Sequence, residues 1–345
     1  MLEGEEVKIL HICAGWQKWN GAANIARLIM DEQRREGHEV LFATWTRIGK
    51  LRTADEVWIH CSWKPCLWWA AIWGRNVHWM PECSYDPIRR RYHGWKKTQV
   101  GPIERFCLRR AKVLVATCEA EKFWIQSYLG KHCPPVEVTD VKRFFRLPQN
   151  DKTGQTHFII SRPLHLLYLG RRHPLKGLEY LEEAVAELNS NLVNPVNAVQ
   201  NSSARSTCPT YPKNSVPSAS QRLCVRFVSN AFGEELEKVW DWCDVLVLPT
   251  LSDNFGLVIA EALERGKRVI TTDGAPAWGE GLELRVGSGG VEELRVDSVG
   301  VGSEIWTGYG GRLIYLKGYR DGTPTERVEL LKHALSSLVS GLTSK

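Results

Sequence analysis

Two acidic residues separated by seven positions follow a short apolar run in the last third of the chain. Residues 245–248 are apolar, Pro249 ends the run, Asp253 stands in the polar segment after it, and Glu261 falls within the helical pattern that follows. A helix that begins at the carboxyl end of a parallel strand offers free N–H groups to an anion. Carboxylates beside it can accept hydrogen bonds from hydroxyl groups. The spacing indicates a site for a ligand with both kinds of group, although a surface acid and a helix-face acid would have the same spacing.

A basic segment repeats this arrangement earlier in the chain. The strand-like residues 165–169 precede Gly170, Arg171 and Lys176, and an amphipathic helical pattern runs from about residue 177 to 188. A glycine turn with two cations at a helix N-terminus suits a diphosphate, because the guanidinium binds oxygens in pairs and the ammonium acts as a point charge. The alternative is a basic loop that only joins a strand to a helix.

Both segments resemble motifs of one enzyme family. The stretch from Asp253 to Glu261 resembles the signature of the family 4 retaining glycosyltransferases of the GT-B fold, and Gly170 to Lys176 resembles their pyrophosphate-binding motif. The resemblance implies that Arg171 and Lys176 hold the donor pyrophosphate and that Glu261 binds the ribose. Asp253 replaces the commoner Glu, which shortens that contact by a methylene group. The residues implied for the donor sugar are Asp253, Asn254, Phe255 and Gly256.

The first half of the chain is similar to the same family over several shorter runs. Gly21 opens the first predicted helix where relatives carry a Gly-Gly loop beside the donor phosphates, so the resemblance assigns it to the pyrophosphate. His60 ends a predicted strand in a run similar to the family's His-x-x-Trp. Glu82 stands where many relatives have His or Arg, in a run seen in members that build bacterial surface polysaccharides. His60 and Glu82 are therefore candidate catalytic contacts, with a purely structural role as the alternative for either.

The order of predicted elements must bring these segments together. Strands and amphipathic helices alternate from residue 7, and the alternation restarts at residue 165, which indicates two α/β, doubly wound parallel-sheet domains. The resemblance implies the GT-B arrangement, two Rossmann-like domains facing across a cleft. We expect an acceptor-binding domain over residues 1–150 and a nucleotide-sugar-binding domain over residues 151–345. Residues 189–221, rich in Asn, Ser and Pro, are expected to form a surface insertion, and the last helix is expected to pack back on the first domain.

Composition fits a cytoplasmic protein. The 345 residues are 43% hydrophobic and 24% charged, and no apolar run approaches the length of about 18 residues that spans a bilayer. The acidic residues 1–6 do not resemble a signal peptide. Ten scattered cysteines without a zinc-like spacing indicate buried thiols in a reducing compartment.

A basic and tryptophan-rich region lies in the first half. Residues 89–97 include five Arg or Lys residues, and several tryptophans flank them. The net charge of the whole chain is +6. Such a region could contact an anionic membrane at the inner face of the cell membrane, bringing the enzyme to a lipid-linked glycan. The alternatives are a solvated helix face and indoles buried in a core. Nucleic acid is the weakest candidate partner, because no nucleic-acid-binding module accompanies the charges.

The resemblance also implies a mechanism. No DxD motif is present, so we expect no metal and no cofactor, with a UDP- or GDP-sugar as co-substrate. Arg171, Lys176 and helix N–H groups would then stabilise the departing nucleoside diphosphate, and the sugar would be transferred with retention of configuration. Two other functions remain open, a sugar-nucleotide epimerase or hydrolase and a degenerate, non-catalytic binding module. A nicotinamide dehydrogenase is disfavoured, since no GxGxxG follows the first strand.

Overall fold

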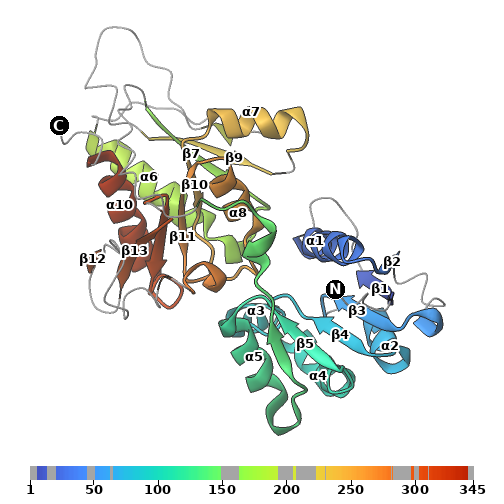
Figure 1. Cartoon of the computed structure of the whole chain (residues 1–345). Coiled ribbons are helices and arrows are strands. Elements are labelled where there is room, and N and C mark those ends of the chain that lie inside the picture. The colour runs from blue at the N-terminus through green and yellow to red at the C-terminus, as the bar shows by residue number, and fades with distance from the viewer. Residues whose placement is uncertain are drawn as a thin grey trace, which may run out of the picture. The chain divides into compact units, whose positions relative to one another are not determined.

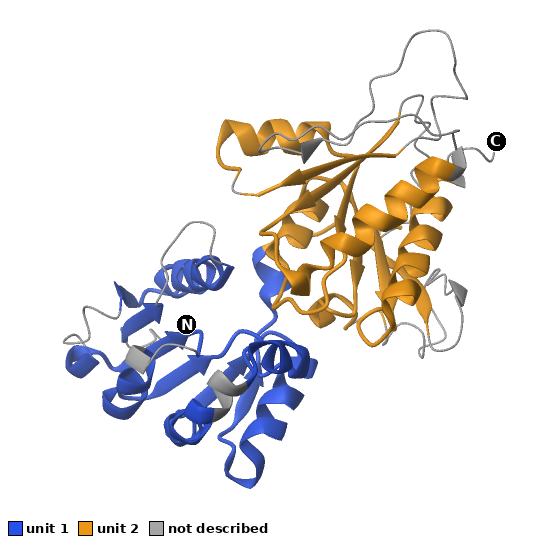
Figure 2. Cartoon of the chain, turned by 180° about the vertical axis from the view of Figure 1, so that it is seen from behind, with its two compact units in different colours: residues 1–144 blue, residues 145–345 orange. Residues whose placement is uncertain are grey.

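The computed structural model contains two compact units, residues 1–144 and 145–345, each with its own sheet (Figures 1 and 2). The described residues are 6–13, 21–44, 51–62, 65–148, 163–192, 205–206, 223–229, 231–280, 282, 297–298, 303–309 and 311–340. Each unit is described by itself below.

The first unit is built on a six-stranded, wholly parallel sheet. Its order is β2-β1-β3-β4-β5-β6. Strand β2 is therefore added on one side of β1, and β3 to β6 are added one after another on the other side. The strands are β1 (Lys8–Cys13), β2 (Glu39–Ala43), β3 (Glu56–His60), β4 (Val77–Met80), β5 (Val113–Ala116) and β6 (Val136–Val138).

Helices cover both faces of this sheet. They are α1 (Gly21–Arg35), α2 (Pro65–Trp73), α3 (Pro87–His93), α4 (Trp95–Leu108) and α5 (Glu119–Leu129), with the 3₁₀ turns η2 (Gly130–His132) and η3 (Val141–Phe144). Right-handed crossovers in opposite directions place α1 on one face and α2, α4 and α5 on the other (Figure 1). The core joins strand residues such as Leu10, Ile59 and Trp79 to Leu67 of α2 and Leu108 of α4.

The second unit has an eight-stranded sheet in the order β12-β13-β14-β11-β10-β7-β9-β8. Its parallel centre consists of β7 (Leu164–Leu169), β9 (Leu223–Val228), β10 (Val245–Leu248), β11 (Arg268–Thr272) and β14 (Leu313–Lys317). The antiparallel strands β8 (Arg205–Ser206), β12 (Asp297–Ser298) and β13 (Glu304–Gly308) extend it at the two edges. The buried strands are nearly continuous apolar runs, as expected for a parallel sheet covered on both faces.

The helices of the second unit are α6 (Leu178–Leu192), α7 (Glu234–Trp242), α8 (Leu257–Glu264) and α10 (Pro324–Ser340), with the 3₁₀ turns η4 (Pro174–Lys176) and η6 (Pro276–Trp278). Helix α10 packs on α6, where Lys332 pairs with Glu187 at 2.7 Å. The expected packing of the last helix on the first domain stays a prediction.

The prediction of two parallel-sheet α/β units is confirmed. The expected insertion at 189–221 overlaps the end of α6, and apart from β8 its remainder lies outside the described residues. Throughout the described chain, no helix combines the length and the apolar character needed to cross a membrane.

Candidate functional site

The two sequence motifs meet at the carboxyl edge of the second sheet. Strand β7 lies between β9 and β10, and the chain passes from one side of β7 to the other, which makes the β7–β10 junction a topological switch point. Many α/β proteins bind their ligands at the carboxyl edge of the sheet beside such a point. Lys176 is on the loop after β7, and Asp253 is on the loop after β10.

Backbone hydrogen bonds hold these two loops together. The carbonyl oxygen of Leu175 accepts bonds from the Leu251 N–H at 2.9 Å and the Thr250 hydroxyl at 3.0 Å. Gly177 has a φ of +61°, and a Cβ placed on it would lie 2.1 Å from the carbonyl oxygen of Pro249. The close approach of the two loops therefore depends on a residue without a side chain at position 177.

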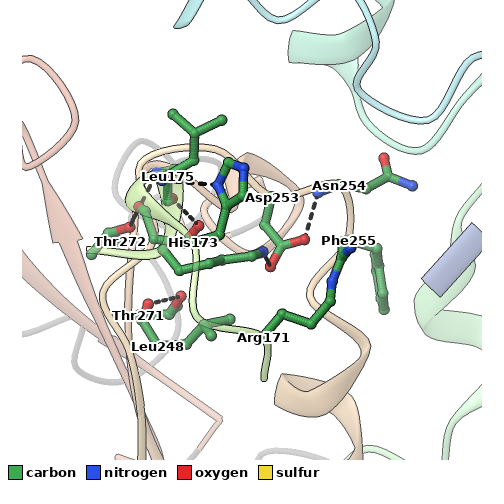
Figure 3. A network of polar contacts seen from close by, with 12 residues as sticks. Arg171, His173, Leu175, Leu248, Asp253, Asn254, Phe255, Thr271 and Thr272 are labelled. Atoms are coloured by element: carbon green, nitrogen blue, oxygen red, sulfur yellow. Dashed lines mark hydrogen bonds and ion pairs between the residues drawn. The ribbon is translucent and has the colours of Figure 1, made fainter. Parts of the chain in front are cut away.

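A third loop, after β11, supports Asp253 from the other side. The Asp253 N–H donates to the Gly274 carbonyl at 2.8 Å, and the Thr272 hydroxyl donates to the Thr250 carbonyl. The Asp253 carboxylate also accepts a bond from the Asn254 N–H at 2.8 Å. Figure 3 shows these contacts, with Asp253 at the centre of the network.

Lys176 and Asp253 form an ion pair across the junction. The ammonium donates to Asp253 Oδ2, and the two side chains are 17% and 19% exposed. Because neither charge is fully buried, both can reach a ligand bound at this edge of the sheet. The structure thus brings together two side chains that lie 77 positions apart and that the sequence assigned to one donor site.

The two arginines of the basic segment have different surroundings. Arg171 is exposed, and its carbonyl oxygen accepts a bond from the Tyr168 hydroxyl at 2.9 Å (Figure 3). Arg172 pairs with Glu182 at 2.6 Å and lies 5.7 Å from the centre of the Phe227 ring. Arg172 is therefore held by its own unit, whereas the Arg171 side chain extends from the loop beside Lys176.

Helix α8 positions Glu261. The helix begins after Gly256, whose φ is +66°, and Glu261 lies five residues further on. Burial raises the pKa of the Glu261 carboxyl, and Arg265 beside it opposes this shift. Arg265 itself pairs with Glu237 of α7 at 2.9 Å. The carboxyl accepts no hydrogen bond from the described residues, so it is available to a ligand hydroxyl.

Phe255 and Asp273 have structural roles. The Phe255 ring is buried between Phe145 and Trp278, and its carbonyl oxygen accepts a bond from Trp278 Nε1 at 2.6 Å. The Asp273 carboxylate accepts bonds from the backbone N–H groups of Gly318 and Arg320. Burial raises the pKa of Asp273 to about 6.

In the first unit, His60 and Glu82 lie next to each other at the ends of β3 and β4. His60 Nδ1 is 3.5 Å from Glu82 Oε1, and both side chains are buried. Glu82 and the next residue, Cys83, have φ values of 56° and 57°, a conformation uncommon for residues other than glycine. Such strain in two successive residues is characteristic of functional sites.

A buried polar chain continues from His60 into the unit. His60 Nε2 is 3.0 Å from His11 Nδ1, and His11 Nε2 is 2.7 Å from Gln33 Oε1. Since an amide oxygen only accepts, the proton of His11 lies on Nε2, where it is donated to Gln33. His11 Nδ1 therefore accepts the Nε2–H of His60. His60 Nδ1 then faces Glu82 without a proton of its own. Burial lowers the pKa of His60 to about 3 and raises the pKa of Glu82 to about 8. The carboxyl of Glu82 is thus the group that carries the proton of this pair at neutral pH.

Sequence reasoning missed the residues that support His60 and Glu82. Besides His11 and Gln33, the buried Glu121 accepts bonds from the N–H of Cys83 and from the N–H and hydroxyl of Thr117. The sequence signal that could have identified Glu121 is its position on the apolar face of α5, where an acid needs hydrogen-bond donors around it. Gly21 begins α1, where an added Cβ would meet open space; residues 14–20 before it lie outside the described residues.

Two parallel-sheet α/β units, the second with cations and acids on loops at its switch point, match the GT-B fold of solved glycosyltransferase structures. In agreement, the chain is similar to solved glycosyltransferase structures over nearly its whole length. WaaG, a glycosyltransferase involved in lipopolysaccharide biosynthesis, aligns with a TM-score of 0.55 at 14% identity, covering 97% of this chain and 92% of that one. Anabaena HepE, solved in complex with UDP and glucose, aligns with a TM-score of 0.51 at 15% identity, covering 98% and 92%.

Residues 163–293 match the family model described as "Glycosyl transferases group 1". A D-inositol 3-phosphate glycosyltransferase of Corynebacterium efficiens is 31% identical over 132 residues, which are 36% of this chain and 31% of the relative. The matched residues 163–293, which include Arg171, Lys176, Asp253 and Glu261, are similar to the group 1 (GT4) glycosyltransferases, as the sequence motifs predicted. The match to the curated relative spans only about a third of that relative's length.

Proposed function

We propose that the protein transfers a sugar from a nucleoside-diphosphate sugar to a glycan or lipid-linked glycan, with retention of configuration and without a metal. The observation that carries this proposal is the meeting of Lys176 and Asp253 at the switch point of the second sheet. A cation for the diphosphate and an acid for the sugar hydroxyls lie there on adjoining loops, with Arg171 beside them.

The donor would bind across the loops after β7 and β10. Lys176 and the exposed Arg171 would hold the pyrophosphate. Asp253, with the backbone of residues 254–256, would contact the sugar, while the partly buried Glu261 would accept a hydrogen bond from a ribose hydroxyl. The ligands of HepE support a UDP-sugar over a GDP-sugar as the donor.

The bond that breaks joins the anomeric carbon of the sugar to a phosphate oxygen, and the electron pair leaves with the nucleoside diphosphate. Negative charge therefore grows on the β-phosphate in the transition state. Arg171 and Lys176 are placed to stabilise that charge and would do so more strongly in the transition state than in the bound donor. The acceptor oxygen would then form its bond on the face from which the diphosphate leaves.

The acceptor side of the proposal rests on the first unit. Its run of residues resembles members that build surface polysaccharide, and WaaG acts in lipopolysaccharide biosynthesis. A lipid-linked acceptor would place the protein at the inner face of the cell membrane as a peripheral protein. His60 and Glu82 are the candidate contacts for the reacting sugars in this unit.

A second candidate function is supported by one observation. The His60–Glu82 pair supplies a titratable acid and base at the carboxyl edge of the first sheet, which an epimerase or hydrolase of nucleotide sugars requires. A binding module without activity is disfavoured by the ion pair and by the ligand-accessible Glu261.

Incubation with a panel of nucleotide sugars separates these functions. A transferase releases nucleoside diphosphate much faster when acceptor glycans are added. A hydrolase releases it at the same rate without acceptor, an epimerase changes the sugar without releasing diphosphate, and a binding module does neither. Acceptor-independent turnover with every donor would overturn the proposal.

Replacement of the site residues tests the donor site directly. We expect Lys176→Ala to slow transfer about a hundredfold, since loss of one charge-stabilising group costs about 3 kcal/mol in the barrier. Glu261→Ala is expected to weaken donor binding and transfer, because the ribose loses its acceptor. Initial rates with the preferred donor measure both effects.

Arg172→Ala is the matched control, because it removes a neighbouring cation that is paired with Glu182. We expect its activity to stay within a few-fold of the unmodified protein. Circular dichroism checks that all three variants fold. Near-normal rates in folded Lys176→Ala, or an equal loss in Arg172→Ala, would contradict the site.

A further inference from the structure

An exposed apolar surface lies on two adjacent helices of the first unit. Among the described residues, Trp69 and Trp73 of α2 are 58% and 56% exposed, and Ile103 and Phe106 of α4 are 56% and 58% exposed. The chain's other exposed large hydrophobic side chains in the described part are more scattered, on α3, α5, β6 and the loop after β9. Large side chains of this kind, close together on a surface, indicate a contact with something outside the unit.

The spacing of these residues explains why they share one surface. Helix α2 buries Leu67 and Ala70 against the sheet and therefore turns Trp69 and Trp73, four positions apart, outward. Helix α4 buries Cys107 and Leu108 in the same way and exposes Ile103 and Phe106, three positions apart. The two helices pack against each other on one face of the sheet (Figure 1), and each exposes two large apolar side chains. We call the exposed side of this helix pair, with Trp69, Trp73, Ile103 and Phe106, the α2–α4 surface.

The structure separates the tryptophans of this region into two groups. Trp79 is buried in the core, with its Nε1–H donated to the Cys61 carbonyl at 2.8 Å. Trp68 packs against the core and donates to the Ser62 carbonyl at 3.2 Å. Trp69 and Trp73 are the ones that point away. The side chains of Trp63 and Trp95 lie outside the described residues.

Arginines border the α2–α4 surface. The Arg52 guanidinium lies 6.0 Å from the centre of the Trp73 ring, and the Arg110 guanidinium lies 5.9 Å from the centre of the Phe106 ring. Arg109 is exposed beside Arg110. The sequences of α2 and α4 contain one acid, Glu104, which is buried and accepts a hydrogen bond from Tyr128. The surface is therefore apolar at its centre and basic at its border.

We propose that the α2–α4 surface binds the headgroup region of an anionic lipid bilayer. Indole and phenyl rings favour the boundary between headgroups and acyl chains, and arginines beside them bind lipid phosphates. The absence of exposed acids on the two helices matches an anionic partner. This inference deepens the acceptor part of the proposed function and rests on it only for the idea that the acceptor is lipid-linked.

The test is flotation of the full chain with vesicles, without any sugar. Vesicles of phosphatidylcholine with about a third phosphatidylglycerol are compared with pure phosphatidylcholine, at low salt and at about 0.5 M salt. We expect binding to the anionic vesicles that weakens at high salt, because ions screen the arginines. The double variant Trp69→Ser/Trp73→Ser is expected to reduce the bound fraction at least about tenfold, and Arg52→Ser/Arg110→Ser is expected to remove the preference for anionic lipid.

Two variants elsewhere in the first unit serve as matched controls. Val138→Ser replaces an exposed apolar residue on β6, and Arg35→Ser removes an exposed arginine of α1, on the opposite face of the sheet. Both are expected to bind vesicles as the unmodified protein does. Equal binding by the tryptophan double variant, or no binding of the unmodified protein to anionic vesicles, would overturn the proposal. Self-association through the same residues, detected by light scattering without lipid, would also overturn it.

The activity of the same variants separates this inference from the proposed function. With a water-soluble acceptor, Trp69→Ser/Trp73→Ser is expected to transfer sugar at the normal rate. Vesicle binding without sugar transfer would refute the proposed function but not the proposal that the α2–α4 surface binds membrane. Sugar transfer without vesicle binding would refute only the membrane-binding proposal.

Discussion

At the scale of single residues, Asp253 and Glu82, two of the positions where the sequence departs from the motifs that it resembles, have clear physical surroundings. Asp253, the shorter acid, is in an ion pair with Lys176, so the missing methylene group does not leave it isolated. Glu82, which stands where relatives have a cation, is in a buried pair with His60. A carboxyl that carries a proton can donate a hydrogen bond as a cationic side chain does, which is how Glu82 could replace a histidine.

The protonation of Glu82 predicts a pH dependence of stability. Burial raises its pKa from 4.5 to about 8, so the folded state holds the proton while the unfolded state releases it. The stabilisation is complete below pH 4.5 and is lost as the pH rises towards 8. From pH 6.5 to 8 the free energy of unfolding should fall by up to about 1.4 kcal/mol per pH unit. His60, with its pKa lowered to about 3, contributes a change only below pH 6.5.

Glu82→Gln removes the titration and leaves an uncharged side chain of the same length beside His60. Denaturant unfolding at several pH values above 6.5 should give a flatter profile for this variant than for the unmodified protein. The groups near Glu82 that could also contribute, Arg89 and Glu121, are the same in both proteins. Identical slopes would show that Glu82 is ionised in the folded state.

At the scale of elements, the site depends on the loops after β7, β10 and β11 approaching each other. Between the loops after β7 and β10, a point of close approach is Gly177, where an added Cβ would lie 2.1 Å from the Pro249 carbonyl oxygen. Any side chain there must separate the loop that carries Lys176 from the loop that carries Asp253.

Gly177→Ala is therefore expected to destabilise the protein by more than its strained φ alone would cost, which is on the order of 1–3 kcal/mol. Gly266→Ala is the matched control, because Gly266 also has a positive φ, of +70°, but open space around its Cβ position. Denaturant unfolding of both variants measures the difference. Donor affinity should fall only in Gly177→Ala, and equal effects in the two variants would show that the loop contact is unimportant.

The alternation of apolar strands and amphipathic helices was enough to predict the two parallel sheets, because the period of burial is local in sequence. The meeting of Lys176 and Asp253 followed from their positions after strands, whereas the roles of Arg171 and Glu261 stay predictions. The buried chain of Gln33, His11, His60 and Glu82 could not be predicted, because its members come from four elements and only their packing shows that they touch. The same holds for the division of the tryptophans, since α2 exposes Trp69 but packs Trp68 on the core.

At the scale of the whole molecule, each unit has its own sheet and its own buried residues. Units built in this way can unfold as separate cooperative transitions. The proposed donor groups Lys176, Asp253 and Glu261 all belong to the second unit, so a nucleotide should stabilise mainly that unit.

Thermal unfolding with and without UDP tests this expectation by calorimetry. Ligand at about a hundred times its Kd adds roughly 2.7 kcal/mol to the state that binds it. We expect one transition to move upward while the other stays within error, and Lys176→Ala to remove most of the shift. An equal shift of both transitions would indicate that the two units unfold together.

The Lys176–Asp253 ion pair also bears on how the reaction ends. In the empty site each partner neutralises the other, and an incoming ligand must separate them. An intact donor compensates at both ends, because its phosphates replace Asp253 as the partner of Lys176 and its sugar hydroxyls replace Lys176 as the partner of Asp253. The nucleoside diphosphate left after transfer pairs with Lys176 but no longer brings sugar hydroxyls to Asp253, so re-forming the ion pair favours expulsion of the product and keeps the site free for the next donor.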